Sequence, residues 1–201
     1  MDHAPRSGGP VGLDIGSLTP VLAYWQGLRR GRAVPARTDL DPVVLQPWLA
    51  GAGIVERDEG RSIRFRLGGR VIAGLLGVEP RGMSLGALFA VAARDRLTGL
   101  TEAVFDGPRL LCMTLVAPHV AAGKPQIEVP MVVMPLCDAS GTVTRALVCV
   151  DVDARAGLAL PCRFQIRQAV LSAAGPQPRL TGLRVARGGA PALRVIEGGR
   201  G

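Results

Sequence analysis

The first part of the chain carries an apolar stripe at helical spacing. The stripe consists of Leu18, Leu22, Trp25 and Leu28. This spacing predicts an amphipathic helix that follows a capping residue, Ser17, and ends at Gly31. Asp41 and Pro42 then have the residue types of an N-cap and a first helical position, which predicts a second helix over residues 42–51.

Five segments have the patterns of β-strands. They are residues 54–56, 62–67, 109–117, 126–137 and 142–152. In the second strand Ile63, Phe65 and Leu67 alternate with polar residues, which predicts one buried and one solvated face. The last three strands are apolar at both parities, so we expect a sheet covered on both sides. Pro130 and Pro135 interrupt one of them, and we expect a bulge there.

Helical segments lie between and after these strands. We expect helices over residues 71–76, 85–89 and 90–105, and one more over residues 164–174. The order of elements predicts an α+β protein with a five-stranded antiparallel sheet.

This order resembles that of a PAS domain, and two motifs strengthen the resemblance. The first consists of Trp25, Leu28, Arg29, Gly31, Arg32, Pro35, Arg37, Asp39, Asp41, Pro42, Leu45 and Leu49. The second consists of Phe65, Arg66, Leu67 and Gly69, with Pro135-Leu136 near the end of the penultimate strand. Over residues 18–152 the chain resembles a bacterial family of stand-alone PAS-like proteins, common in alphaproteobacteria and formerly a domain of unknown function.

The resemblance implies an arrangement and a role. We expect a flexible N-terminus over residues 1–16, a PAS-like domain over 17–153 and a basic, partly disordered tail over 154–201. Short helices would cover one sheet face. The N-terminal helix would lie on the other face or pair with its copy in a homodimer. The implied role is a regulatory or sensory module for signal transduction that binds a small ligand, a signalling protein or both.

A ligand cavity in such a domain would lie between the short helices and the sheet. The candidate lining residues are Phe65, Leu75, Leu88, Phe89, Met113, Met131 and Val133. A methionine-rich lining adapts to a small apolar ligand, whereas the same residues also suit a filled core. A filled core with an exposed apolar patch would instead indicate a ligand-free protein-interaction scaffold.

The arginine-rich stretch after the first helix has two interpretations. Arg29, Arg32 and Arg37 precede Asp39 and Asp41, and Arg–carboxylate hydrogen bonds between them would form a structural joint. A phosphate-contacting arm is the alternative, but the two aspartates argue against it.

The net charge of +8 is concentrated at the C-terminal end. Residues 17–153 contain 15 basic and 13 acidic residues, whereas residues 154–201 contain eight arginines and one acid, Glu197. This tail allows a nucleic-acid-associated regulator as a third hypothesis, although no aromatic residue that could stack on bases follows Phe164.

Cofactor and catalytic chemistry find little support. The PCRFQ stretch at Cys162 resembles the signature of flavin-binding light sensors but lies after the last PAS strand, and only His3 and His119 could ligate haem. We therefore expect neither flavin nor haem, no metal site and no enzymatic activity. No apolar run reaches the length of a membrane span and no secretory signal is present, so we expect a cytoplasmic protein.

Overall fold

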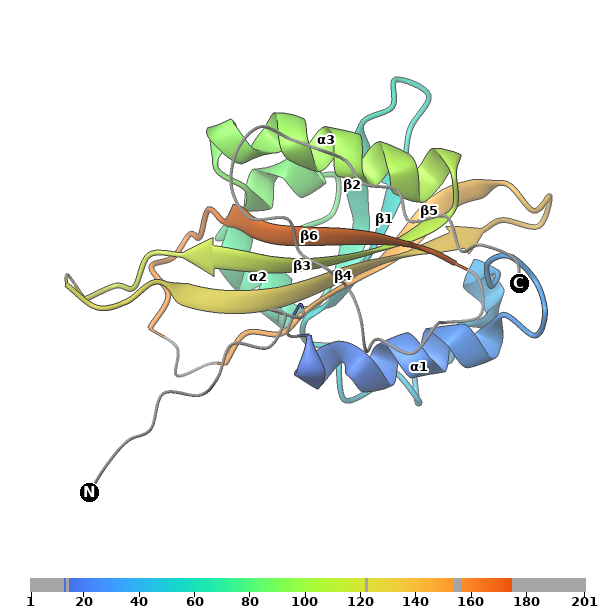
Figure 1. The fold of residues 1–201 in the computed structure, drawn as a ribbon, viewed down its shortest axis with the longest axis horizontal. Helices are drawn as coiled ribbons and strands as arrows, with labels where there is room; N and C mark the ends of the chain where they lie inside the picture. The colour runs from blue at the N-terminus through green and yellow to red at the C-terminus, as the bar shows by residue number, and fades with distance from the viewer. Residues whose placement is uncertain (1–12, 14, 122, 154–156, 175–201) are drawn as a thin grey trace, which may run out of the picture.

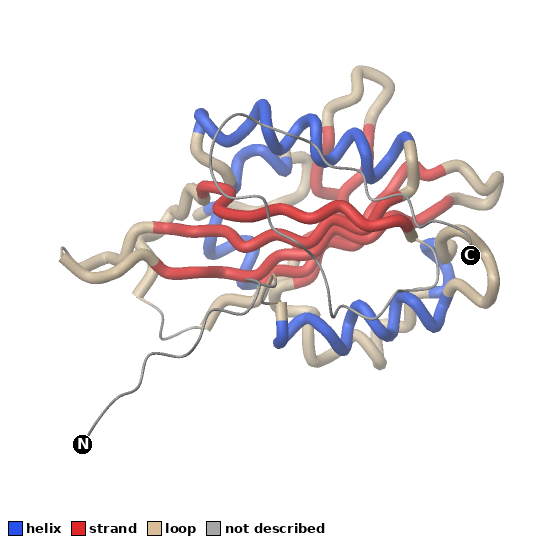
Figure 2. The backbone as a smooth tube through the Cα atoms, in the orientation of Figure 1, coloured by secondary structure: helices blue, strands red, loops and turns tan. Residues whose placement is uncertain are grey.

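The computed structural model describes residue 13 and residues 15–121, 123–153 and 157–174, which form an antiparallel sheet with helices on both faces (Figures 1 and 2). The strands are β1 (Ala52–Arg57), β2 (Ile63–Gly68), β3 (Arg109–Ala117), β4 (Ile127–Cys137), β5 (Val143–Val150) and β6 (Gln165–Ala173). Their order in the sheet is β2-β1-β5-β4-β3-β6, and every neighbouring pair is antiparallel. The α+β prediction therefore stands, but the sheet has six strands instead of five.

The helices form a layer on each side of the sheet (Figure 1). The inner face is covered by α2 (Arg70–Leu76), the 3₁₀ turn η3 (Leu85–Leu88) and α3 (Val91–Asp106). The outer face is covered by η1 (Gly16–Leu18) and α1 (Thr19–Leu28), followed by the 3₁₀ turn η2 (Arg37–Asp39). None of the helices in the described ranges is long and apolar enough to cross a membrane.

Strand β6 corrects the helix predicted over residues 164–174. It pairs with β3 from Arg109 to Val116 and forms one edge of the sheet. This strand lies within the segment expected to be a partly disordered tail, while residues 154–156 and 175–201 fall outside the described residues. Residues 1–12 and 14 of the expected flexible N-terminus also fall outside them.

The predicted second helix, over residues 42–51, is replaced by a loop of successive turns. The amides of Leu45 and Leu49 donate to the carbonyls of Asp41 and Leu45, at 3.0 and 3.1 Å. These bonds have helical spacing, but Pro47 between them has no N–H to continue the ladder. The segment therefore forms isolated turns without an α-helix.

The two prolines of β4 are accommodated in different ways. Pro130 lies opposite Thr114 in a regular part of the ladder, so the expected bulge is absent there. Pro135 lies opposite Ala146, and the ladder shifts register only after it, between Leu136 and Cys137. The expected irregularity is therefore found beside Pro135 only.

Candidate functional site

The residues predicted to line an internal cavity are brought together, but as packed core. Phe65, Leu88, Phe89, Met113, Met131 and Val133 are fully buried, and Leu75 is 2% exposed. All seven belong to the cluster between the inner sheet face and its helices. Two hollows found among the described residues are both lined by other side chains. The inner face therefore resembles the filled-core alternative.

The larger hollow is a groove on the outer face, with a volume of about 340 Å³. Its lining consists of Arg37, Leu40, Pro42, Leu45, Leu49, Ala52, Gly53, Ile54, Leu67, Gly68, Gly69 and Leu147. The loop over residues 37–49 forms one wall, and β1, the end of β2 and β5 form the floor. Arg37 is the only lining residue with a charged or polar side chain, so the groove is apolar with a basic margin.

A β-bulge places Leu67 in this groove. Val55 pairs with Phe65 and Ile54 pairs with Leu67, so Arg66 is the extra residue in β2. Phe65 therefore lies in the inner core, whereas Leu67 lines the outer groove beside Ile54. The sequence pattern predicted Phe65 and Leu67 on one face, and this prediction is wrong because the bulge reverses the alternation.

Close backbone contacts fix the loop against the sheet. The amide of Gly69 donates to Ala52, and that of Val71 donates to Ala50, both at 2.8 Å. A Cβ atom on Gly69 would lie 2.0 Å from the carbonyl oxygen of Leu49. Only glycine allows this approach, so Gly69 determines the shape of the groove.

Apolar side chains remain exposed in and around the groove. Leu49 and Leu67 are 43% and 48% exposed although both line it, and Val43 and Val44 in the same loop are 78% and 46% exposed. Four large aliphatic residues within one short loop and the neighbouring strand end are thus in contact with water, and such exposure is typical of an interaction site.

The predicted structural joint is only partly formed by its five residues. Arg32 donates to Asp39 at 2.5 Å, and this hydrogen bond lowers the pKa of Asp39 below its usual value. Arg29 donates instead to the carbonyls of Arg32 and Ala33. The carboxylate of Asp41 accepts a hydrogen bond from the amide of Val43.

Arg37 is the remaining member of that set. Its side chain is exposed, and no hydrogen bond or ion pair to it is found within the described ranges. It lies at the groove instead of in the joint. The sequence predicted that Arg37 belongs to the Arg–carboxylate joint, and for this arginine the prediction is wrong.

Helix α1 uses its apolar stripe on its own sheet. Leu18, Leu22 and Trp25 are buried, while Leu28 is partly exposed. Trp25 donates its indole N–H to the carbonyl of Pro135 at 3.0 Å. Of the two expected arrangements the structure shows the sheet contact, which leaves this stripe unavailable to a second copy.

Beside the groove, three charged residues form a network on the outer face. Arg66 and Arg145 each donate to Glu56 at 2.9 Å. The hydrogen bond from Arg66, with that from Arg145, lowers the pKa of Glu56 although partial burial opposes this. Arg66 and Arg145 are therefore both paired with Glu56, and the unpaired positive charge at the groove is that of Arg37.

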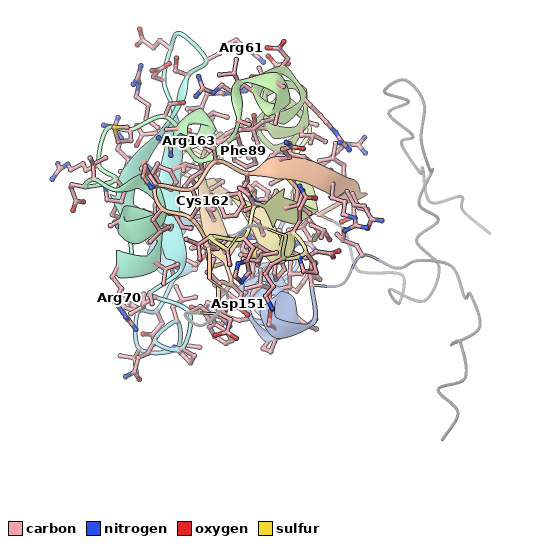
Figure 3. The ribbon with its side chains drawn as sticks, turned by 90° about the vertical axis from the view of Figure 1, so that its left-hand side faces the viewer. Arg61, Arg70, Phe89, Asp151, Cys162 and Arg163 are labelled. Atoms are coloured by element: carbon pink, nitrogen blue, oxygen red, sulfur yellow. The ribbon has the colours of Figure 1, made fainter. Side chains whose placement is uncertain are left out.

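The four cysteines and His119 do not come together as a group that could hold a metal ion within the described residues. Cys162 lies in the loop before β6, beside Phe89 and Arg163 (Figure 3). Burial raises the pKa of Cys112 and of Cys149 to about 12, so both thiols stay protonated at neutral pH. His119 accepts a hydrogen bond at Nδ1 from the amide of Ala121. His3 lies outside the described residues.

The fold and the sequence comparisons agree on a family. An antiparallel sheet with short helices on one face and the N-terminal helix on the other is the arrangement that the resemblance implied. The family model for the PAS domain matches residues 14–151, and the chain belongs to this family. No curated protein matches the chain. Strand β6 lies beyond the matched residues.

PAS domains serve as sensory and regulatory modules and commonly mediate protein interactions. Sequence reasoning missed the groove, although two signals for it were present. Leu40, Leu45 and Leu49 are apolar residues in a stretch that cannot continue as a helix through Pro47. The Gly68-Gly69 pair marks a close backbone approach at the end of a strand.

Proposed function

We propose that this PAS-domain protein is a regulatory module without enzymatic activity, and that it acts by binding a partner protein at the outer groove. The observation that carries the proposal is the contrast between the seven buried cavity candidates and the half-exposed leucines of the groove. A ligand held in the inner core would need space that these side chains occupy. A partner protein would cover apolar surface that is now in contact with water.

Native mass spectrometry tests the filled core. We expect the folded protein to have the mass of the bare chain. A fixed mass increment that disappears on denaturation would contradict the proposal and support a small ligand retained in the core.

Proximity labelling in the cells that make the protein tests the groove. We compare the wild type with Leu67→Asp, which places a charge in the groove, and with Val91→Asp. Val91 is 76% exposed and begins α3 on the opposite sheet face, so it is a matched control. We expect Leu67→Asp, and not Val91→Asp, to lose a defined set of labelled proteins. Identical labelling by all three would contradict partner binding at the groove.

A further inference from the structure

We infer that the groove binds an acidic amphipathic segment of the partner protein, whose apolar residues enter the groove while a carboxylate pairs with Arg37. This inference rests on the proposed function and names the chemistry of the partner at the same site. It follows from the size of the apolar surface, the composition of the groove lining and the charges at its margin.

The extent of the apolar surface favours a protein segment over a small molecule. A ligand that filled the groove would leave Val43, 78% exposed in the adjoining loop, still in contact with water. Small-molecule sites also hold several polar groups that orient the ligand, and this lining has the single arginine. A peptide brings its own backbone and additional apolar residues, so it can cover the groove and the adjoining loop together.

The charges at the margin favour an acidic segment. Arg37 lines the groove and is exposed, while the nearest carboxylate on the same turn, Asp39, is held by Arg32. Arg70, the first residue of α2, directly follows the lining residue Gly69 and is also exposed (Figure 3). Asp41 is the acidic residue next to the lining residue Pro42, and its carboxylate accepts a hydrogen bond from the amide of Val43. The margin is therefore net positive and suits carboxylate groups.

The arginine at the margin would set specificity, and the leucines would supply most of the affinity. The groove floor is rigid, because it is built on paired strands and on the close approach at Gly69. Leu67 is held there by the bulge and is 48% exposed, so covering it removes apolar area from water without rearranging the core.

A displayed library of random twelve-residue peptides provides the probe. It is selected on the full-length wild type, on Leu67→Asp, on Arg37→Gln and on Arg167→Gln. Arg167 lies on β6, at the sheet edge opposite to β2, and within the described part of the chain its side chain pairs with the exposed Glu128, so its substitution is a charge-matched control.

We expect the wild type and Arg167→Gln to enrich peptides that combine aliphatic or aromatic residues with Asp or Glu. Leu67→Asp should lose this enrichment. Arg37→Gln should retain the apolar preference and lose the acidic one. For a selected peptide, Arg37→Gln should weaken binding about tenfold, and the same peptide with its acid changed to the amide should show no further loss.

Three results would overturn the inference. They are an enrichment of neutral or basic peptides, equal effects of Arg37→Gln and Arg167→Gln, and the absence of any peptide that depends on Leu67. Binding of decanoate at Leu67 without peptide binding would show that the occupant is an amphiphile, and a groove-dependent dimer in sedimentation would show that it is a second copy of the chain.

The labelling experiment separates this inference from the proposed function. If cellular labelling depends on the groove but peptides show no acidic preference, only this inference fails. If labelling ignores the groove, the proposed function fails as well.

Discussion

The two faces of the sheet are closed by different means. On the inner face α2, η3 and α3 cover the strands, and Phe65, Phe89 and Met113 are fully buried beneath them. On the outer face α1 covers the middle strands, but the loop over residues 37–49 covers the end near β1 and β2. Neither of the two hollows lies under the inner helices: the smaller is bordered by η1, and the larger is the groove that the loop leaves.

This difference shows why the groove lies where it does. A helix presents a continuous row of side chains to a sheet, and Trp25 also satisfies the carbonyl of Pro135. The loop cannot form such a row, because Pro47 interrupts its hydrogen bonds and Val43 points to solvent. The incomplete cover leaves apolar side chains in contact with water, and this is the surface at which we propose that a partner binds.

The largest expected effect is at Phe65 of β2, and the comparison is with Leu67 two residues later in the same strand. Phe65→Ala should lower the free energy of unfolding by about 3–5 kcal/mol, because it empties the inner core. Leu67→Ala should lower it by about 1 kcal/mol or less, because that side chain is half exposed. Urea unfolding followed by circular dichroism measures both. Equal losses would contradict the assignment of the two residues to opposite faces.

The helical cover of the outer face depends on Trp25. Trp25→Phe should lower the free energy of unfolding by about 2–3 kcal/mol, since it leaves the carbonyl of Pro135 unsatisfied and a small cavity. Tyr24→Phe is the control. It removes the hydroxyl that accepts a hydrogen bond from the exposed amide of Asp41, and it should lower the free energy of unfolding by about 0.5–1.5 kcal/mol. The order of the two losses in urea unfolding checks the prediction.

The loop cover depends on Gly69. Gly69→Ala should lower the free energy of unfolding by about 1 kcal/mol or more, because the new Cβ displaces the carbonyl of Leu49. Gly74→Ala, inside α2 with nothing within 4 Å of its Cβ position, should raise it by about 0.4–1 kcal/mol. Differential scanning calorimetry measures the two midpoints, and a midpoint of Gly69→Ala at or above that of the wild type would refute the close approach.

The smallest effect concerns the charged network beside the groove. The lowered pKa of Glu56 means that its ionised form stabilises the folded state. This stabilisation of the folded state is complete at pH values above 4.5, the ordinary pKa of a glutamate. It is lost as the pH falls through the lower pKa that Glu56 has in the folded protein. The difference in unfolding free energy between wild type and Glu56→Gln should therefore shrink on acidification. A difference that is constant between pH 7 and pH 3 would contradict the network.

Sequence patterns predicted the parts of the fold that local periodicity determines. The limits of β3, from Arg109 to Ala117, agree with the predicted strand, and those of α3 differ by one residue at each end. Long apolar runs form the central strands, and the turn residues between them mark their ends. The presence of a covering layer on each face of the sheet was also predictable, because both faces of these strands are apolar.

The groove and the last strand could not be predicted in this way. Leu67 reaches the outer face through a bulge at Arg66, which a strict two-residue period does not contain. Residues 165–173 have helix-forming glutamines, alanine and leucine, but pairing with the distant β3 makes them a strand. Both features depend on a neighbouring strand, so the segment alone does not determine them.

The position of β6 has a consequence for the chain as it leaves the ribosome. Strands β1 to β5 are complete at Val150, but β3 then still has one unpaired edge, along Arg109 to Val116. That edge stays open until residues 165–173 have been synthesised and released from the exit tunnel. Strand β6 thus protects β3 from pairing with another chain, and a chain cut at residue 151, where the family match ends, would keep the edge exposed.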